Sequence, residues 1–217
     1  MGIKSKIVNL VDVLVNKRRV KYQRSLKKQN RNFNPTIIAN DCMGGMIYHT
    51  LGLRFCSPTI NLAIPKESFF NLCEDLEHFL QVEVREVKNT DKSFPVGELL
   101  FNGRRVEIYF MHYKTFEEAK QKWEERLKRV DFNNLFILQT LSKNPTDEDI
   151  YRFEKLPYKN KMLILGHNKW KAKNVVENKA YQVEEPVAGA ILQYERGTSK
   201  KRYMDYVDYV KFLNPTK

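Results

Sequence analysis

The stretch that decides the fold runs from residue 36 to residue 61 and reads TIIANDCMGGMIYHTLGLRFCSPTIN. A β-branched run ends in Asn40-Asp41-Cys42, crosses Gly44-Gly45 and enters an apolar segment that stops at Gly52. This pattern predicts a strand, a glycine turn, a short helix and then a second strand at 59–64. Polar side chains at a strand's carboxyl end, followed by glycines and a helix N-terminus, favour the binding of an anion or another polar ligand.

The same turn has an alternative interpretation in which it binds nothing. Asn40 or Asp41 would cap the helix, and the glycines would only allow the tight geometry. The turn is not a Walker loop, because no Gly-Lys-Ser/Thr follows it, and its glycine spacing does not fit a dinucleotide fingerprint. Cys42 is a candidate nucleophile because a helix N-terminus lowers a thiol pKa, although a free cysteine is more often a small buried hydrophobe.

Strand and helix patterns alternate along the rest of the chain. Asn102-Gly103 between two apolar runs predicts a β-hairpin, and Thr115-Phe116-Glu117-Glu118 is a capping box that opens a helix. Continuous apolar runs at 134–140 and 161–165 are typical of strands covered on both faces. Further helices are expected at 66–81, 145–153 and 203–213, and further strands at 82–87 and 187–194. We therefore predict an α/β fold with a mixed, mostly parallel sheet, helices on both faces and one antiparallel hairpin at about 94–111.

The net charge of +12 is concentrated at the N-terminus. Residues 1–31 hold ten Lys or Arg and one acid, whereas the remaining residues hold 28 bases and 25 acids. Apolar residues also repeat at helical spacing before Lys17, so 1–31 is predicted to be a basic amphipathic arm or helix and 32–217 a single α/β domain. Such an arm can lie on an anionic membrane or dock on the domain with a solvated basic face. Nucleic acid is the least favoured partner, because the arm carries no recognised nucleic-acid-binding motif.

Composition and spacing exclude several classes of protein. Three cysteines among 217 residues form no metal-ligand spacing and fit a reducing compartment better than a disulfide framework. The apolar run at 7–15 is too short and too polar for a bilayer span or a signal peptide. The Asp147-Glu148-Asp149 sequence has a spacing that can hold a metal, but first-turn acids complementing a helix dipole are the preferred interpretation. No metal and no cofactor are therefore expected.

Two other clusters are candidates for chemistry. His112-Tyr113 follows the second hairpin strand, where a histidine can act as an acid or base, contact a phosphate, or simply bond a nearby carbonyl. Lys159 and Lys161 enter the strand at 161–165, where they would bind an anion or form a solvated loop. Arg126 flanks the buried face of the helix that the capping box opens.

These segments together resemble a bacterial family, domain of unknown function family 1919, often labelled exopolysaccharide biosynthesis protein. The resemblance covers roughly residues 33–170 and rests on the following motifs: Asn40–Gly45 with Tyr48, Leu51-Gly52-Leu53 leading to Ser57–Leu62, Phe94-Pro95-Val96-Gly97, His112-Tyr113, Glu118-Ala119, Lys122-Trp123 with Arg126, Asn133–Phe136, and Leu156–Lys161.

The resemblance implies a setting in polysaccharide assembly without an established reaction. It suggests an intracellular protein of exopolysaccharide or capsule biosynthesis, at the inner face of the membrane. A metal-independent glycosyltransferase-like enzyme with a nucleotide-sugar donor and a glycan acceptor is the leading hypothesis. The alternative is a non-catalytic assembly protein that is anchored at the membrane surface by residues 1–31 and recognises a glycan or anion.

The candidate site follows from the turn, the clusters and the resemblance together. Catalytic roles are expected for Asp41 and His112. Ligand-binding roles are expected for these residues: Asn40, Cys42, Gly44, Gly45, Tyr48, Ser57, Asn61, Tyr113, Lys159 and Lys161.

Overall fold

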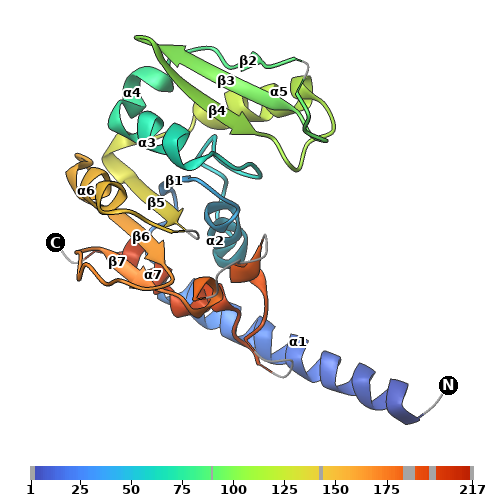
Figure 1. The fold of residues 1–217 in the computed structure, drawn as a ribbon. Helices are drawn as coiled ribbons and strands as arrows, with labels where there is room; N and C mark the ends of the chain where they lie inside the picture. Colours follow the sequence, from blue (N-terminus) through green and yellow to red (C-terminus); the bar gives the residue numbers. More distant parts are fainter. Residues whose placement is uncertain (1–2, 89, 142–143, 183–188, 196–198, 216–217) are drawn as a thin grey trace.

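The computed structural model describes residues 3–88, 90–141, 144–182, 189–195 and 199–215, with the side chains of the first helix from Leu14 onward. That helix, α1 (Ile3–Gln29), extends away from the rest of the molecule at its N-terminal end (Figure 1). Its C-terminal half packs on the body, where Val15 and Arg19 are buried. Within the described part of the chain, no helix is both long enough and apolar enough to cross a membrane.

A four-stranded parallel sheet forms the centre of the molecule. Its strands are β1 (Thr36–Ala39), β5 (Leu135–Leu141), β6 (Lys161–Leu165) and β7 (Val175–Glu177), hydrogen-bonded in that order. All seven residues of β5 are buried, as expected for a continuous apolar strand between two layers. The parallel sheet and the α/β class are confirmed.

A second, three-stranded antiparallel sheet consists of β2 (Arg85–Glu86), β3 (Val96–Phe101) and β4 (Arg104–Tyr109). Asn102 and Gly103 have φ values of 47° and 70°, as their turn requires, and the predicted hairpin is confirmed. The hairpin does not belong to the parallel sheet. Its strand β3 pairs with β4 on one side and with β2 on the other. The predicted mixed sheet is therefore divided between two separate sheets (Figure 1).

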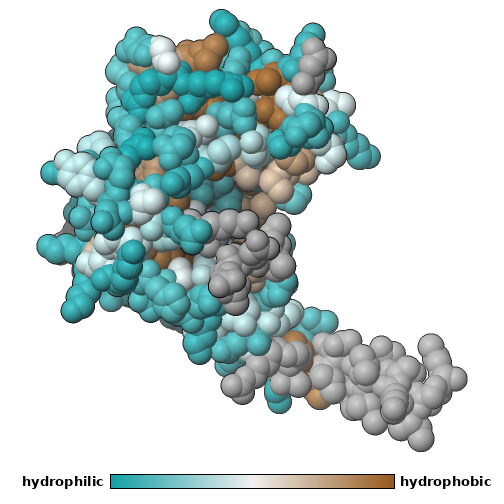
Figure 2. All heavy atoms as spheres, in the orientation of Figure 1, coloured by the Kyte–Doolittle hydropathy of each residue, from teal (hydrophilic) through white to brown (hydrophobic). Residues whose placement is uncertain are grey.

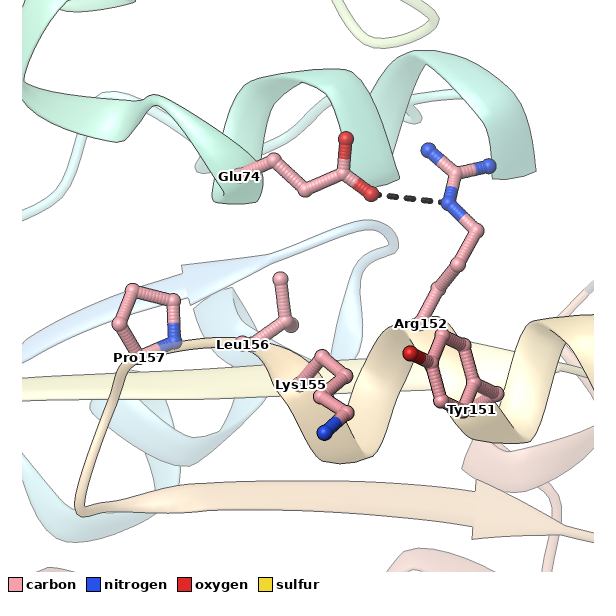
Figure 3. Close-up of a pocket in the computed structure, with 6 residues that line it drawn as sticks. All are labelled: Glu74, Tyr151, Arg152, Lys155, Leu156 and Pro157. Atoms are coloured by element: carbon pink, nitrogen blue, oxygen red, sulfur yellow. Dashed lines mark hydrogen bonds and ion pairs between the residues drawn. The ribbon is translucent and has the colours of Figure 1, made fainter.

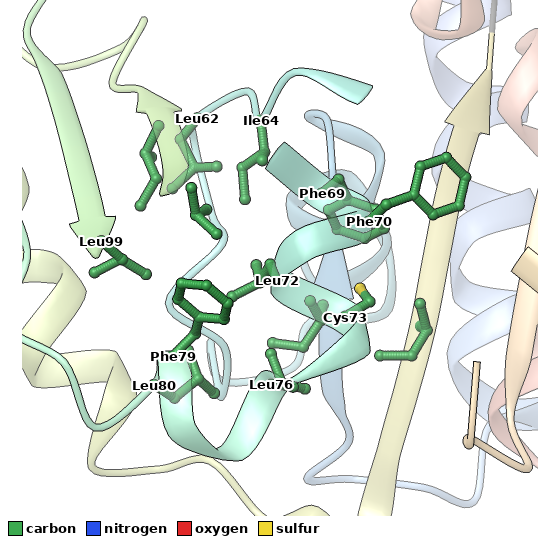
Figure 4. Packing of buried hydrophobic residues seen from close by; sticks show 14 of the residues in the cluster. Leu62, Ile64, Phe69, Phe70, Leu72, Cys73, Leu76, Phe79, Leu80 and Leu99 are labelled. Carbon is green, nitrogen blue, oxygen red and sulfur yellow. The ribbon is translucent and has the colours of Figure 1, made fainter. Parts of the chain in front are cut away.

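Helices cover both faces of the parallel sheet. One face packs on α3 (Lys66–Glu74), α4 (Leu76–Phe79), α5 (Phe116–Leu127), α6 (Asp147–Lys155) and the antiparallel sheet. Side chains of α3 lie between the parallel sheet and Leu99 of β3, so one core joins the two sheets (Figure 4). The other face packs on α2 (Met43–Leu51) and α7 (Tyr209–Leu213). Short 3-10 helices lie at Phe132–Asn134, Lys179–Tyr181, Ala190–Leu192 and Tyr203–Tyr206.

Several predicted elements differ from the observed ones. The segment 59–64 is not a strand; only Ala63 forms a bridge, to Tyr109, and Asn61 has a φ of 60° that interrupts an extended chain. The helix predicted at 66–81 is divided at Asp75, and the strand predicted at 82–87 is reduced to β2. The helix predicted at 203–213 is interrupted between η4 (Tyr203–Tyr206) and α7.

The C-terminal part of the chain was the least predictable. Strand β7 lies in a segment without a clear apolar period. The strand predicted at 187–194 lies partly outside the described residues, and its described part contains a 3-10 helix.

Candidate functional site

Strands β1 and β5 end side by side, and the side chain of Asn40 joins their carboxyl ends. Asn40 Nδ2 donates to the Thr140 carbonyl at 2.9 Å, and the Thr140 amide donates to Asn40 Oδ1 at 2.8 Å. The Asn40 side chain thus continues the ladder of hydrogen bonds after β1 itself has ended. The carboxyl edge of a parallel sheet is the place where α/β proteins bind ligands.

Helix α2 begins directly at this edge. Asp41 Oδ1 accepts a hydrogen bond from the Met43 amide at 2.9 Å, so Asp41, directly before the N-cap residue Cys42, satisfies the first amide of the helix. A Cβ on Gly44 would lie 2.8 Å from the Ala39 Cβ, so this glycine allows α2 to pack against β1. The amides of Gly44 and Gly45 belong to the first helical turn, where backbone N–H groups have no partner within the helix.

His112 reaches this helix N-terminus from the antiparallel sheet. Ala63 and Tyr109 exchange two backbone hydrogen bonds of 2.8 Å, which attach the end of β4 to the segment beside β1. Three residues later, Nε2 of the exposed His112 lies 3.3 Å from Sγ of the half-buried Cys42. Residues 70 positions apart in the chain therefore meet at the start of α2.

The electrostatic environment of this contact favours uncharged groups. Burial raises the pKa of Asp41, against the opposing effects of the Met43 amide and the Thr140 side chain. Burial and the nearby Asp41 carboxyl raise the pKa of the Cys42 thiol. The thiol therefore stays protonated at neutral pH, and the direction of its hydrogen bond with Nε2 follows from the tautomer of His112.

Tyr181 completes the cluster from the C-terminal part of the chain. Burial raises its pKa first, and the Asp41 carboxyl and the Cys42 thiol also raise it, whereas the Thr140 side chain lowers it. The Tyr181 carbonyl would clash with any Cβ on Gly166, at 2.1 Å, so this tyrosine is held at the end of β6. We refer to Asp41, Cys42, His112, Thr140 and Tyr181, with the first turn of α2, as the carboxyl-edge site.

Comparisons with known proteins place the chain in a family. The family described as Domain of unknown function (DUF1919) matches residues 12–214. The chain belongs to this family. It is also similar to an uncharacterized protein of Haemophilus influenzae, with 36% identity over 202 residues that cover 92% of this chain and 94% of the relative. The resemblance inferred from the motifs is thereby confirmed, and the match extends beyond them into α1 and the C-terminal segment.

In this DUF1919 protein, some of the motif residues stabilise the open edge of β1. The Ile37 amide donates to the Tyr48 hydroxyl at 3.0 Å, and that hydroxyl donates to the Pro35 carbonyl at 2.6 Å. The Ala39 amide donates to Thr59 Oγ1 at 3.0 Å, and Ser57 Oγ lies 3.1 Å from the same oxygen. Tyr48, Ser57 and Thr59 are fully buried and supply the hydrogen bonds that a further strand would supply.

Asn61 and Tyr113 lie beside the carboxyl-edge site. Asn61 Oδ1 would be 3.7 Å from a Cβ on Gly45, so its exposed side chain flanks the first turn of α2. The Tyr113 hydroxyl donates to the Ile60 carbonyl at 3.3 Å and accepts from the buried Arg126 at 2.8 Å. Arg126 also donates to the Ile60 carbonyl at 2.9 Å, so its guanidinium fixes the segment beside β1.

The lysines lie at the opposite end of the sheet. Lys161 begins β6, and its ammonium donates to the carbonyls of Glu154 and Leu156 at 2.7 and 2.6 Å. Lys159 is exposed two residues earlier. Because β1, β5 and β6 are parallel, the start of β6 is remote from their carboxyl ends. The structure therefore brings Asp41, Cys42 and His112 together and leaves Lys159 and Lys161 outside their site.

The acidic sequence at 147–149 has a structural role. Thr146 and Asp149 form a capping box, and the Lys66 ammonium lies 2.9 Å from the Asp149 carboxylate. Asp147 accepts a hydrogen bond from the Trp170 indole at 2.6 Å. Within the described residues, no group of three or more His, Cys, Asp or Glu side chains could hold a metal ion.

A shallow pocket between α3 and α6 lies elsewhere on the surface. It is lined by Glu74, Tyr151, Arg152, Lys155, Leu156 and Pro157 (Figure 3). Arg152 is already paired with Glu74 at 2.8 Å and with Glu67 at 2.7 Å, and its guanidinium lies over the Phe70 ring. Its charge is thus neutralised by its own neighbours, so this pocket offers little to an anionic ligand.

Sequence reasoning missed two members of the site. Thr140 follows Gln139 near the end of the strand run, and these two polar residues after Leu135–Leu138 could have drawn attention to the strand end. Tyr181 lies in a segment without periodicity, and only the folded chain brings it to the end of β6.

Proposed function

We propose that the protein is a metal-independent, sugar-transferring enzyme of bacterial exopolysaccharide or capsule assembly that works at the cytoplasmic face of the membrane. Its donor would be a nucleotide sugar and its acceptor a glycan hydroxyl. The polysaccharide setting comes from the family resemblance. The observation that carries the enzymatic part is the 3.3 Å contact between Cys42 Sγ and His112 Nε2 at the N-terminus of α2.

The diphosphate of the donor would bind at the first turn of α2. The amides of Gly44 and Gly45 and the positive end of the helix dipole favour an anion there. A diphosphate bound there would act in the same direction as burial and raise the pKa of the Asp41 carboxyl further. Lys159 and Lys161 take no part in this arrangement, since they lie at the other end of the sheet.

His112 would act as the general base of the transfer. In the tautomer that donates from Nε2 to Cys42 Sγ, Nδ1 would accept the proton of the acceptor hydroxyl as that oxygen bonds to the anomeric carbon. The bond from the anomeric carbon to the phosphate oxygen would break, and the nucleoside diphosphate would leave with the electron pair. Asp41 would position the first turn of α2. Cys42 would orient the His112 ring rather than attack, because its thiol stays protonated.

A thermal-shift screen tests the proposal directly. The full chain would be heated with UDP-glucose, UDP-N-acetylglucosamine, GDP-mannose and the matching free nucleotides. At least one should raise the midpoint, because a ligand that binds only the folded state stabilises it by about 2.7 kcal/mol at 100 times its Kd. His112→Ala should abolish transfer, and the matched control Lys159→Ala should retain it. The absence of any stabilisation at millimolar ligand would contradict the proposal.

The second candidate function is a non-catalytic protein that binds a glycan or anion at the membrane surface. The extended, basic α1 favours it. Polysaccharide production in a deletion strain separates the two. Under the enzymatic proposal, His112→Ala fails to restore production. Under the alternative, His112→Ala restores it and a chain without residues 1–31 does not.

A further inference from the structure

A second polar pocket lies where α1 joins the body, and it shares no lining residue with the carboxyl-edge site. Four of its lining residues, Arg18, Lys21, Tyr22 and Ser25, come from α1, and the fifth, Lys200, comes from the C-terminal segment. Spacings of three, four and seven residues place the four α1 side chains on one face of the helix. We call this the α1 pocket.

A buried ion pair holds the two walls of the pocket together. Arg19, which is 5% exposed, pairs with Asp205, and its Nη1 also donates to the Lys200 carbonyl at 3.2 Å. Asp205 accepts further hydrogen bonds from the Arg202 amide at 2.7 Å and the Tyr209 hydroxyl at 3.2 Å. The position of Lys200 against α1 is therefore fixed by the fold.

The cationic side chains that line the α1 pocket differ from Arg19 in their pairing. Arg19 is neutralised by Asp205, but none of the ion pairs among the described residues uses Arg18, Lys21 or Lys200. The Lys200 ammonium lies 5.7 Å from the centre of the Tyr22 ring, which directs it over the pocket. Burial raises the pKa of Tyr22, and Asp205 and Asp208 are both close enough to raise it further. Asp205 is paired with Arg19, and Asp208 caps α7 by accepting from the Lys211 amide. Three cationic side chains and the hydroxyls of Tyr22 and Ser25 thus line the pocket, and among the described residues none of the three cations is in an ion pair.

We propose that the α1 pocket binds a phosphate group, either a monoester or one end of a diphosphate. A phosphate carries nearly two negative charges and several acceptor oxygens, which match a guanidinium, two ammonium groups and two hydroxyl donors. The exposed Leu14 lies one turn before Arg18 on the same face of α1, so an apolar group next to the phosphate would also be accommodated. Figure 2 shows hydrophilic residues around the base of α1 and a small hydrophobic patch on the helix itself.

The phosphate can be presented by a lipid headgroup or be free in solution, and two assays distinguish these sources. Full-length protein would be sedimented with vesicles of phosphatidylcholine, with and without phosphatidic acid. In parallel, inorganic pyrophosphate would be titrated by calorimetry. The inference is independent of the transfer reaction, because the residues of the α1 pocket contribute nothing to the carboxyl-edge site.

A matched pair of double variants makes the test specific to the pocket. Arg18→Ala/Lys21→Ala removes two charges from the pocket face of α1, and Lys17→Ala/Arg24→Ala removes two charges from other positions on the same helix. All four side chains are exposed, so both variants should fold, which their circular dichroism would verify. Lys200→Ala leaves its backbone carbonyl in place for Arg19. It removes only the ammonium.

We expect the pocket variants to weaken binding at least about tenfold and the control variant to weaken it much less. If the pocket variants weaken binding to phosphatidic acid vesicles alone, the phosphate belongs to a lipid headgroup. If they weaken binding of pyrophosphate alone, the ligand is a soluble phosphate. Weaker binding in both assays would mean that the pocket recognises the phosphate whatever carries it. Pyrophosphate bound at α2 would contribute equally to all variants. Equal weakening by the two double variants, or no binding in either assay, would overturn the proposal.

Discussion

The open edge and the carboxyl end of β1 carry polar side chains from the same stretch of sequence, but they use them differently. Along the edge, the hydroxyls of Tyr48 and Thr59 are fully buried and bonded to the backbone of β1. At the end, Asp41, Cys42 and His112 bond mainly to one another and to the start of α2, and His112 is exposed. A polar motif next to a strand can therefore mean edge protection or a binding site. The partner of each side chain decides between the two.

The largest effect is expected from Tyr48→Phe. The substitution leaves the Ile37 amide and the Pro35 carbonyl without their hydrogen-bond partner, and Tyr48 is fully buried. We expect the free energy of unfolding to fall by about 2–4 kcal/mol, measured by urea denaturation. Tyr151→Phe, at an exposed tyrosine, is the control and should change it by less than about 0.5 kcal/mol. Equal effects of the two would show that the edge does not depend on the hydroxyl.

Two buried threonines compare a hydroxyl that bonds the β1 backbone with a hydroxyl that does not. Thr59→Val removes the acceptor of the Ala39 amide and should cost about 1–2 kcal/mol of stability in urea denaturation. Thr50→Val is the matched control, because the buried Thr50 hydroxyl has no hydrogen-bond partner among the described residues. Its replacement should be neutral or stabilising. If Thr50→Val proved as costly as Thr59→Val, the loss would come from packing and not from the hydrogen bond.

Sequence patterns predicted the backbone of this region better than its side-chain partners. The strand at Thr36, the helix stop at Gly52 and the hairpin turn follow from local propensity, and the structure contains all three. The sequence cannot show which backbone group a serine, threonine or tyrosine will bond, because that depends on residues distant in the chain. Hence Tyr48 and Ser57 were expected to bind a ligand, whereas their bonds protect an edge, and Tyr181 was not expected at all.

A pH-dependent change in stability is expected at the carboxyl end. Burial raises the pKa of Asp41 in the folded protein, so the folded chain holds this proton more tightly than the unfolded chain. The contribution of Asp41 to wild-type stability should thus decrease as the pH rises from the unfolded pKa of about 3.9 through the raised folded pKa. Asp41→Asn keeps an oxygen for the Met43 amide and removes the titration. Relative to wild type, its stability should therefore increase with pH across this window.

Asp149 provides the control of opposite sign. Burial opposes its ionisation, but hydrogen bonds with Lys66 and Thr146 outweigh burial and lower its pKa. Asp149→Asn should therefore lose stability relative to wild type as the pH rises through the range between the lowered and unfolded values. Urea denaturation across the acidic range measures both variants. The same trend in both would contradict the assigned environments.

The smallest effect concerns the reactivity of Cys42. Burial and Asp41 raise the pKa of its thiol, so alkylation by iodoacetamide at pH 7.5 should be slow. Asp41→Asn removes part of that effect and should accelerate the modification of Cys42 by less than about tenfold. Mass spectrometry of the peptides follows the rate, with the buried Cys56 and Cys73 as internal controls. An unchanged rate would mean that Asp41 does not influence the thiol.

The central claim is that a nucleotide sugar binds at the carboxyl end of β1, on the first turn of α2. Backbone amide NMR spectra, recorded while the nucleotide sugar found by thermal shift is added, test it most directly. We expect the amide resonances of Gly44 and Gly45 to shift with ligand concentration and the resonance of Gly103, in the hairpin turn, to stay in place. Saturable shifts elsewhere, with Gly44 and Gly45 unaffected, would contradict it.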